Sequence, residues 1–266
     1  MSIRRPNGNG ARDRITVPCG KCPACLGNKR VNWALRMREE LKVSKSAKFI
    51  TLTYNDDKNT GSVSKIDVQL FLKRFRALCF KVEVDLKLRY YITGEYGLKG
   101  HRPHYHAIMY NTPNVNEMEL YEMIGKAWKN GHSFIGTVTD RSIMYVAKYL
   151  LKGSIIPEGC EEPFSLMSSR PGIGSTYIER MSDWHHADLE RSYVPKDGYK
   201  LGMPRYWKDK IYCRNTIEKQ KEEFLKLDKE KFEELIRGNA NYWENEFNFE
   251  KDLYRKLELI NNRKKL

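Results

Sequence analysis

Two hydrophobic periods alternate between residues 49 and 152, and this alternation constrains the fold more than any other feature. Four short segments are rich in β-branched and aromatic residues, as strands are, and three longer segments repeat apolar residues at helical spacing. The order β-α-β-β-α-β-α predicts an α+β fold, in which helices flank an antiparallel sheet as in a ferredoxin-like sandwich. We expect strands over Phe49–Tyr54, Leu88–Thr93, His104–Tyr110 and Ser133–Val138, and helices over 64–78, 116–129 and 140–152.

The rest of the chain differs in composition from this core, which we delimit as residues 49–153. Residues 1–48 form an arm that contains a cysteine cluster followed by a basic amphipathic helix. Residues 154–213 are rich in Pro, Gly and Ser and have poor periodicity, so we expect an irregular, loop-rich region. Residues 214–266 are highly charged and are expected to form a helical tail. The prediction is one core with helical additions at both ends.

The chain is strongly basic, with 48 Lys and Arg against 34 Asp and Glu and a formal net charge of +14. Such a surplus favours an acidic partner, and nucleic acid is the commonest one. Aromatic side chains near the basic segments are candidates for stacking on unpaired bases, namely Trp33, Tyr91 and Tyr96. The residues that we expect to contact phosphates are Lys29, Arg30, Arg36 and Arg74.

The chain carries no recognisable signal for export or for a membrane. No run approaches the roughly 18 apolar residues of a membrane span. The segment MSIRRPNGNGARDR has no apolar core behind its positive charges, as a secretory signal would have. We therefore expect a protein that stays in a cytoplasm and has no membrane partner.

Three of the six cysteines lie within seven residues of one another. In a reducing compartment, cysteines serve as thiols or metal ligands more often than as a disulfide frame. Cys19, Cys22 and Cys25 are therefore candidate ligands of a structural zinc ion, although they also fit a plain turn with reduced thiols. Zinc normally takes four ligands, and the fourth stays open among the following residues: Cys160, Cys213, His185 and His186.

A second candidate metal site lies on the predicted hairpin. His104 and His106 are two residues apart on a strand, so their imidazoles share one face while Tyr105 points to the other. An acidic oxygen would complete a site for a divalent ion, and Glu95, across the hairpin loop, is the best candidate. Imidazole and carboxylate ligands suit Mn²⁺ or Zn²⁺, and Mg²⁺ more weakly. His101, on the loop, is a reserve ligand or phosphate contact. Taken alone, such a pair also fits two hydrogen-bonded histidines on a sheet.

The last predicted helix of the core has two distinct faces. Its apolar residues gather on one side, and two phenols and two ammonium groups gather on the other: Tyr145, Lys148, Tyr149 and Lys152. A phenol can attack a phosphodiester to form a phosphotyrosine, and a nearby lysine and metal ion would stabilise the charge that develops. Because Tyr145 and Tyr149 are neighbours at i and i+4, they also allow two successive transfers. The alternative is a surface helix with amphipathic tyrosines.

Together, these segments resemble the HUH-type initiators of rolling-circle replication. The three motifs of that family correspond, in order, to FITLTY at 49–54, PHYH at 103–106 and YVAKY at 145–149. The second tyrosine, the CGKCPACLGNKR segment, the GEYG and RPHYH run and SRPGIGS at 169–175 are similar to the replication protein of gokushoviruses. These are a branch of the microviruses, which are single-stranded DNA phages.

The resemblance implies an origin-specific nickase that acts in the host cytoplasm on single-stranded and supercoiled viral DNA. In such initiators a tyrosine becomes joined to the 5′ phosphate, the freed 3′-OH primes a host polymerase, and a unit-length circle is later rejoined. No G-x-x-x-x-G-K-[ST] phosphate loop occurs in the sequence, so unwinding requires a host helicase.

The family's roles can be carried onto matching positions. Tyr145 and Tyr149 become nucleophiles, in an order that the sequence leaves open, and Lys148 assists them. His104 and His106 become ligands of a Mg²⁺ or Mn²⁺ ion, with Glu95 as the third.

Other classes of protein share parts of this pattern. A relaxase or a transposase would use the same ligands on mobile DNA. A non-catalytic module that binds single-stranded nucleic acid fits the order of elements, but it would need neither the histidine pair nor the tyrosine–lysine face. A zinc-stabilised DNA-binding regulator would rest on the cysteines alone.

Overall fold

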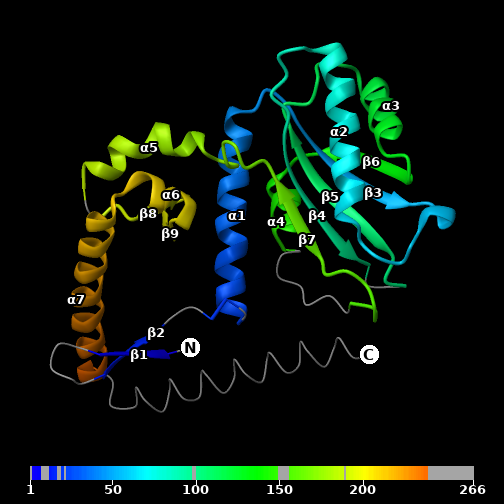
Figure 1. Cartoon of the computed structure of the whole chain (residues 1–266). Coiled ribbons are helices and arrows are strands. Elements are labelled where there is room, and N and C mark those ends of the chain that lie inside the picture. The colour runs from blue at the N-terminus through cyan, green and yellow to red at the C-terminus, as the bar shows by residue number, and fades with distance from the viewer. Residues whose placement is uncertain are drawn as a thin grey trace.

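A computed structural model describes residues 2–6, 12–16, 19–20, 22–97, 100–148, 156–188 and 190–238 (Figure 1). The N-terminal segment and the core contain β1 (Ser2–Pro6), β2 (Arg12–Thr16), α1 (Pro23–Val43), β3 (Ala47–Tyr54), a 3-10 turn η1 (Asp56–Lys58), α2 (Lys65–Val82), β4 (Arg89–Tyr96), β5 (Pro103–Tyr110), α3 (Glu117–Ala127), β6 (Gly131–Thr137) and α4 (Asp140–Lys148). Farther along the chain lie β7 (Phe164–Met167), α5 (Thr176–His186), β8 (Tyr193–Lys196), β9 (Tyr199–Gly202), α6 (Arg205–Ile211) and α7 (Arg214–Gly238).

The central feature is a five-stranded sheet in the order β6-β3-β5-β4-β7, and every neighbouring pair is antiparallel. This confirms the predicted α+β class, and β4 and β5 form the predicted hairpin. The fifth strand, β7, pairs with β4 and lies beyond residue 153. The sheet is therefore larger than the core segment that we delimited from the sequence.

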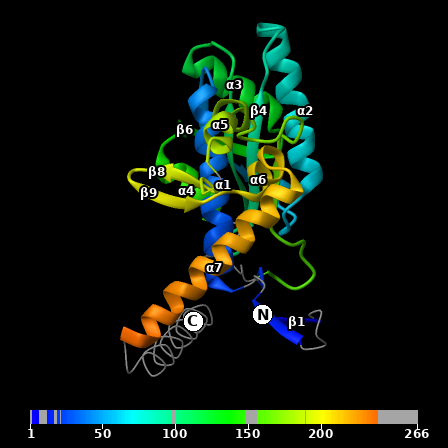
Figure 2. The ribbon, with the colours of Figure 1, turned by 90° about the vertical axis from the view of Figure 1, so that its left-hand side faces the viewer.

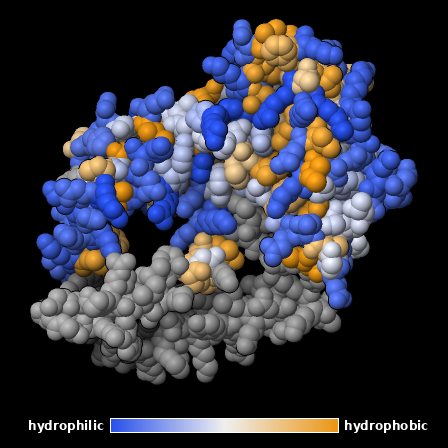
Figure 3. All heavy atoms as spheres, viewed as in Figure 1, coloured by the Kyte–Doolittle hydropathy of each residue, from blue (hydrophilic) through white to orange (hydrophobic). Residues whose placement is uncertain are grey.

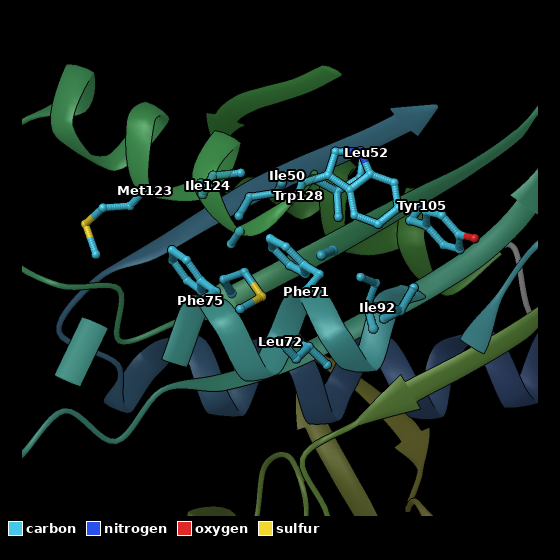
Figure 4. Packing of buried hydrophobic residues seen from close by; sticks show 14 of the residues in the cluster. Ile50, Leu52, Phe71, Leu72, Phe75, Ile92, Tyr105, Met123, Ile124 and Trp128 are labelled. Carbon is cyan, nitrogen blue, oxygen red and sulfur yellow. The ribbon is translucent and has the colours of Figure 1, made fainter. Parts of the chain in front are cut away.

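Both faces of the sheet are covered by helices, which the alternation of side chains in each strand makes possible. On one face, Ile50, Leu52, Ile92 and Tyr105 pack against residues of α2 and α3, such as Phe71 and Trp128 (Figure 4). On the other face, Tyr91, Ile108 and Tyr110 pack against α1 and α4, which lie on the opposite side of the sheet in Figure 1. Neither surface of the sheet is left wholly to solvent.

Helix α1 is longer than the predicted basic helix, because it begins at Pro23, whose fixed φ suits the first turn. It packs against α4, and Arg38 Nε lies 2.8 Å from Asp140 Oδ1 at the first residue of that helix. One side of α1 contributes Ala34 and Met37 to the core on the sheet. The adjacent side contributes Leu35 to a third cluster, formed with α5 and α6.

Residues 154–213 are not the irregular region expected from their composition. They contain β7, α5, the β8–β9 hairpin and α6, which Figure 2 shows in front of α1. The elements are short, and aromatic stacking holds them together: the rings of Tyr177 and Trp207 have centroids 3.9 Å apart at an interplanar angle of 14°. Packing between distant residues stabilises this part, so it leaves no hydrophobic period in the sequence.

The SRPGIGS segment at 169–175 joins the sheet to α1 and α6. Arg89 of β4 donates to the Pro171 and Gly172 carbonyls at 3.0 Å each, and the Gly174 N–H donates to Glu40 Oε2 of α1 at 2.7 Å. Gly174 has a φ of +73°, and a Cβ there would lie 2.6 Å from the Arg36 carbonyl oxygen. The glycine is required by this close approach of two backbones. The segment therefore acts as a structural connector, and these contacts account for its sequence without DNA.

Glu40 and Arg89 form a buried ion pair at this junction. Glu40 is 3% exposed and accepts from Arg89 Nε as well as from its Nη2, the latter at 3.2 Å. Replacing Glu40 by alanine would leave the Arg89 charge buried without its partner, which costs about 3–5 kcal/mol. We expect Glu40→Ala to lower the free energy of unfolding in urea by that amount, measured by circular dichroism.

The matched control is Glu122→Ala. Glu122 pairs with Lys126 at 3.1 Å, but both side chains are exposed, and such pairs contribute only about 0.3–0.5 kcal/mol. A loss of less than ~1 kcal/mol for Glu40→Ala, close to that of the control, would contradict the structural role of the pair.

The ends of the chain carry further elements. Residues 214–238 are helical, in agreement with part of the predicted tail, and the remainder of that tail lies outside the described residues. Among the described helices, none is both long and apolar enough to cross a membrane. Figure 3 shows hydrophobic residues among hydrophilic ones over α2, where Ile66, Leu70 and Phe80 are exposed.

Candidate active site

Three candidate metal ligands meet at one end of the sheet, on the face that α1 and α4 cover. The register pairs Glu95 of β4 with His104 of β5, and it pairs His106 with Thr93 of β4 and with Thr51 of β3. Because directly paired residues point to the same face, the two histidines and the glutamate project together. The period of the strands alone accounts for this convergence.

The ligand atoms of this group are close enough for one ion. His104 Nε2 lies 2.8 Å from Glu95 Oε1, and His106 Nε2 lies 3.4 Å from the same oxygen. All three ligand atoms lie within 4.8 Å of one another. The structure thus brings together the three residues selected from the sequence, and metal binding by them stays a prediction.

The second nitrogen of each imidazole is held from behind. His104 Nδ1 lies 3.1 Å from the Arg102 carbonyl oxygen, which can only accept, so Nδ1 carries the proton in this contact. His106 Nδ1 lies 3.1 Å from Thr51 Oγ1. Both contacts direct Nε2 toward Glu95, as partners behind metal-binding histidines commonly do.

Glu95 is 3% exposed, yet it favours the charged form. Burial alone would raise the pKa of its carboxyl group, but the hydrogen bonds from His104 and His106 outweigh burial and lower the pKa below its usual value. The carboxylate form is the one that binds a cation.

Tyr105, between the two histidines, anchors β5 from the opposite face. Its hydroxyl lies 2.7 Å from the Tyr54 hydroxyl and accepts from the Ser64 N–H, also at 2.7 Å. The strand is therefore fixed on both sides, and the histidines have little freedom to turn away from Glu95.

Thr51 and Phe49 are site residues to which the sequence analysis gave no role. Phe49 stacks on the His106 ring with centroids 5.7 Å apart at 15°, and the Thr51 hydroxyl contacts the far nitrogen of the same ring. Their signal was present in the FITLTY motif, since alternate residues of that strand share the face of the histidines.

Removal of the Thr51 hydroxyl tests its role in orienting His106. Thr51→Val keeps the shape of the side chain, and loss of such a contact typically lowers metal affinity about 10- to 100-fold. We expect this loss for Mn²⁺ in isothermal titration calorimetry, with an unchanged unfolding midpoint. Thr137→Val, at an exposed position of the same sheet, serves as the control. Equal affinities for the two variants would exclude the orienting role.

Helix α4 brings a phenol to this group. The Tyr145 hydroxyl lies 3.4 Å from His106 Nε2, and the two rings have centroids 5.0 Å apart at 80°. Tyr145 is 41% exposed, whereas Ile143, Val146 and Ala147 of the same helix are buried. The apolar and phenolic faces expected from the sequence are therefore present over the described part of the helix.

Comparisons with known proteins agree with this geometry. Residues 47–154 match the model of the Replication-associated protein ORF2 family. The chain is 31% identical to Replication-associated protein VP4 of Bdellovibrio phage phiMH2K, over 77% of this chain and 70% of that protein. It belongs to this family of phage replication-associated proteins.

Two other relatives extend the comparison. Identity is 28% to Replication-associated protein ORF2 of Spiroplasma virus 4, over 77% of this chain and 73% of the relative. It is 26% to Replication-associated protein ORF4 of Chlamydia phage 1, over 73% and 53%. No solved structure matches the chain. Membership associates the protein with phage DNA replication and supports a role as a replication initiator.

The other predicted catalytic residues of this replication-associated protein lie at or beyond the end of α4. Lys148 is exposed at the last residue of that helix. Tyr149, the predicted second nucleophile, and Lys152 lie outside the described residues. The roles of both tyrosines and of Lys148 stay predictions.

Two of the three predicted base-stacking residues are buried. Tyr91 is 0% exposed and packs on Trp33, with ring centroids 5.0 Å apart. Tyr96 is 5% exposed, and its hydroxyl donates to the Glu161 carbonyl oxygen at 2.6 Å. The prediction that they stack on bases is wrong, because helices cover both faces of the sheet. His101, the reserve ligand, lies in a turn and is not part of the ligand group.

The residues predicted to contact phosphates differ in their surroundings. Arg36 has its guanidinium carbon 4.2 Å from the ring centroids of both Trp33 and Tyr206, and its Nε donates to the Ile173 carbonyl oxygen at 2.9 Å. These contacts give Arg36 a structural role. Arg74 Nη1 donates to the Ala127 carbonyl oxygen at 3.4 Å. Phosphate binding by these two arginines, by exposed Lys29 and by half-buried Arg30 stays a prediction.

The cysteine cluster gathers as the sequence suggested. The sulfur atoms of Cys19, Cys22 and Cys25 lie within 4.8 Å of one another, and the Cys22 N–H donates to Cys19 Sγ at 3.1 Å. Within the described ranges, no fourth His, Cys, Asp or Glu joins this group. The residues considered for that place have other partners; for example, His185 contacts the hydroxyl of Tyr177 at 2.9 Å. Zinc binding stays a prediction.

Proposed function

We propose that this replication-associated protein is a metal-dependent, tyrosine-nucleophile DNA nickase of the HUH type that starts rolling-circle replication at the viral origin in the host cytoplasm. The observation that carries the proposal is the position of the Tyr145 hydroxyl, 3.4 Å from His106 Nε2, beside the cluster with His104 and Glu95. A phenol and a metal-binding group this close can act on the same DNA phosphate.

The donor set fits a divalent cation. Two imidazole nitrogens and one carboxylate converge, and the lowered pKa of Glu95 keeps it charged. Mg²⁺ or Mn²⁺ held by Glu95, His104 and His106 would polarise a phosphate oxygen and offset the negative charge that develops during attack. The residues behind the imidazoles keep the donors in place, so little reorganisation is needed when DNA binds.

The Tyr145 phenol acts as the nucleophile. Its oxygen forms a bond to the scissile phosphorus, and the bond from that phosphorus to the 3′ oxygen breaks. The phenol proton passes to water, and the leaving oxygen keeps the electron pair of the broken bond and takes up a proton to become a free 3′-OH. One phosphodiester replaces another, so the same chemistry in reverse rejoins the ends. Exposed Lys148, three residues farther along the helix, offsets phosphate charge.

Tyr149 acts in the second transfer. It follows Tyr145 by four residues, the spacing at which side chains on a helix are neighbours. While one tyrosine holds the 5′ end, the other attacks the regenerated origin, and the released circle has unit length. A host polymerase extends the 3′-OH, and a host helicase separates the strands.

A covalent-adduct assay tests the proposal. Single-stranded oligonucleotides that tile the cognate viral genome are incubated with the protein and Mn²⁺, then separated on a denaturing gel. The 3′-terminal label should migrate with the protein, and a 5′ label should appear on a shorter free strand. EDTA and the Tyr145→Phe/Tyr149→Phe double variant should abolish both products. A non-catalytic binding module would instead shift the oligonucleotide on a native gel and give no adduct.

A further inference from the structure

An edge strand extends the face of the sheet that carries the candidate metal ligands. β6 is the outermost strand on one side, and it pairs only with β3 in the sheet. The register places Phe134 opposite Thr51, and Thr51 opposite His106. Phe134, Thr51 and His106 therefore form one row across the sheet on the same face, and two strand spacings of roughly 10 Å in total separate Phe134 from His106.

Phe134 is exposed although it is a large aromatic residue in a strand. It is 62% exposed, whereas Phe71 and Phe75 on the other face of the sheet are 0% exposed. A Cβ at Gly136 would lie 3.2 Å from the Phe134 ring and 3.7 Å from the Phe49 ring. The missing side chain at Gly136 thus allows the two rings to lie close together.

The aromatic surface continues from Phe134 to the candidate nucleophile. Phe49 stacks on His106, and Tyr145 meets Phe49 edge-on, with ring centroids 6.3 Å apart. Thr51, which lies between Phe134 and His106 in the row, has a short side chain. The exposed ring therefore stands at the outer end of a surface that leads directly to Tyr145.

We propose that Phe134 is a stacking platform for an unpaired base of the DNA strand that is cut, close to the scissile phosphate. This inference rests on the proposed function, and it adds a positioning residue on β6. A phenyl ring with an open face binds the flat surface of any base, but only when the base is outside a duplex. The stacked base holds the strand so that its phosphate lies between His106 and Tyr145.

The charge of the protein favours nucleic acid over a second copy of the chain at this ring. The formal net charge of +14 makes two copies repel one another, whereas it attracts a polyanionic strand. Contact of Phe134 with another copy is the competing occupancy, and the oligomeric state of a variant tests it.

Binding measurements in a cleavage-deficient background test the platform separately from the chemistry. Fluorescence anisotropy with a labelled single-stranded oligonucleotide and Mn²⁺ is measured for the Tyr145→Phe/Tyr149→Phe variant and for the same variant carrying Phe134→Ala. Loss of one stacked base should weaken binding roughly 5- to 150-fold. Phe80→Ala is the matched control, because Phe80 is a 59% exposed phenylalanine on α2, away from this face. Its affinity should stay within about 2-fold of the background.

Abasic substitutions in the oligonucleotide identify the stacked base. With Phe134 present, one abasic position should weaken binding strongly, and with Phe134→Ala the same position should have no further effect. Phe134→Trp should restore affinity, and its fluorescence should be quenched on binding. These aromatic variants keep the test valid even where alanine perturbs the strand.

Two results would overturn the proposal. One is equal affinity of Phe134→Ala and the background protein for every oligonucleotide. The other is a change in sedimentation mass for Phe134→Ala without any change in DNA affinity, which would assign the ring to contact between copies. Because the background lacks both tyrosines, neither result depends on whether the wild-type protein cleaves DNA.

Discussion

Replacing Tyr145 by phenylalanine is expected to abolish first-strand cleavage, with a fall in rate of roughly 10⁴-fold or more. The variant keeps the ring, and so keeps its contacts with His106 and Phe49, but it lacks the oxygen that forms the new bond to phosphorus. No other described side chain offers a hydroxyl at this distance from His106 Nε2, so water would have to replace it at a large cost. Single-turnover adduct formation, followed on denaturing gels, measures the effect.

Tyr149→Phe separates the two steps. This variant should form the first adduct at close to the wild-type rate, yet it should fail to release closed unit-length circles from a substrate with two origins. DNA affinity in EDTA should be the same for both variants and the wild type. If Tyr145→Phe forms the adduct normally and Tyr149→Phe does not, the order of the two nucleophiles is the reverse of the one proposed.

Replacing His106 by alanine is expected to remove both metal binding and cleavage. His106 supplies one of three ligands, and its Nε2 is also the atom closest to the Tyr145 hydroxyl. Loss of a residue that merely orients a ligand costs about 10- to 100-fold in metal affinity, so loss of the ligand itself should cost more than about 100-fold. Calorimetry with Mn²⁺ measures the affinity, and the adduct assay measures the activity.

His101→Ala is the control for this loss. His101 lies close in the sequence but outside the ligand group, so its replacement should leave Mn²⁺ affinity and cleavage almost unchanged. Wild-type metal affinity in His106→Ala would show that the cluster is a structural hydrogen-bonded group, and the proposed mechanism would then fail. A large effect of His101→Ala would instead make that residue a ligand in the DNA-bound state.

The convergence of Glu95, His104 and His106 was predictable because it depends on local geometry. A hairpin brings two adjacent strands together, and the two-residue period decides which side chains share a face. The phenolic face of α4 was predictable for the same reason, since a helix has a fixed period. Position along each element was therefore sufficient to select the candidate site.

Long-range packing decided the features that the sequence did not reveal. Tyr91 resembles an available stacking residue until α1 places Trp33 against it. Residues 154–213 lack a period because Tyr177 and Trp207, far apart in the chain, stabilise each other. Phe134 has the opposite history: its strand was predicted, but only the order of the sheet shows that β6 is at the edge. Such relations depend on the whole topology, which a local pattern does not contain.

Helix α1 has a consequence for how these phages can exchange genetic modules. It supplies Ala34 and Met37 to one hydrophobic cluster and Leu35 to another, while β7 and Ile173 complete the sheet and the first of these clusters from the far side of the candidate site. A recombination event that transferred only residues 47–154 would separate the nicking motifs from partners on both flanks. Viable hybrids between related phages should therefore have crossover points upstream of α1 and downstream of Gly174, outside the stretch that defines the family.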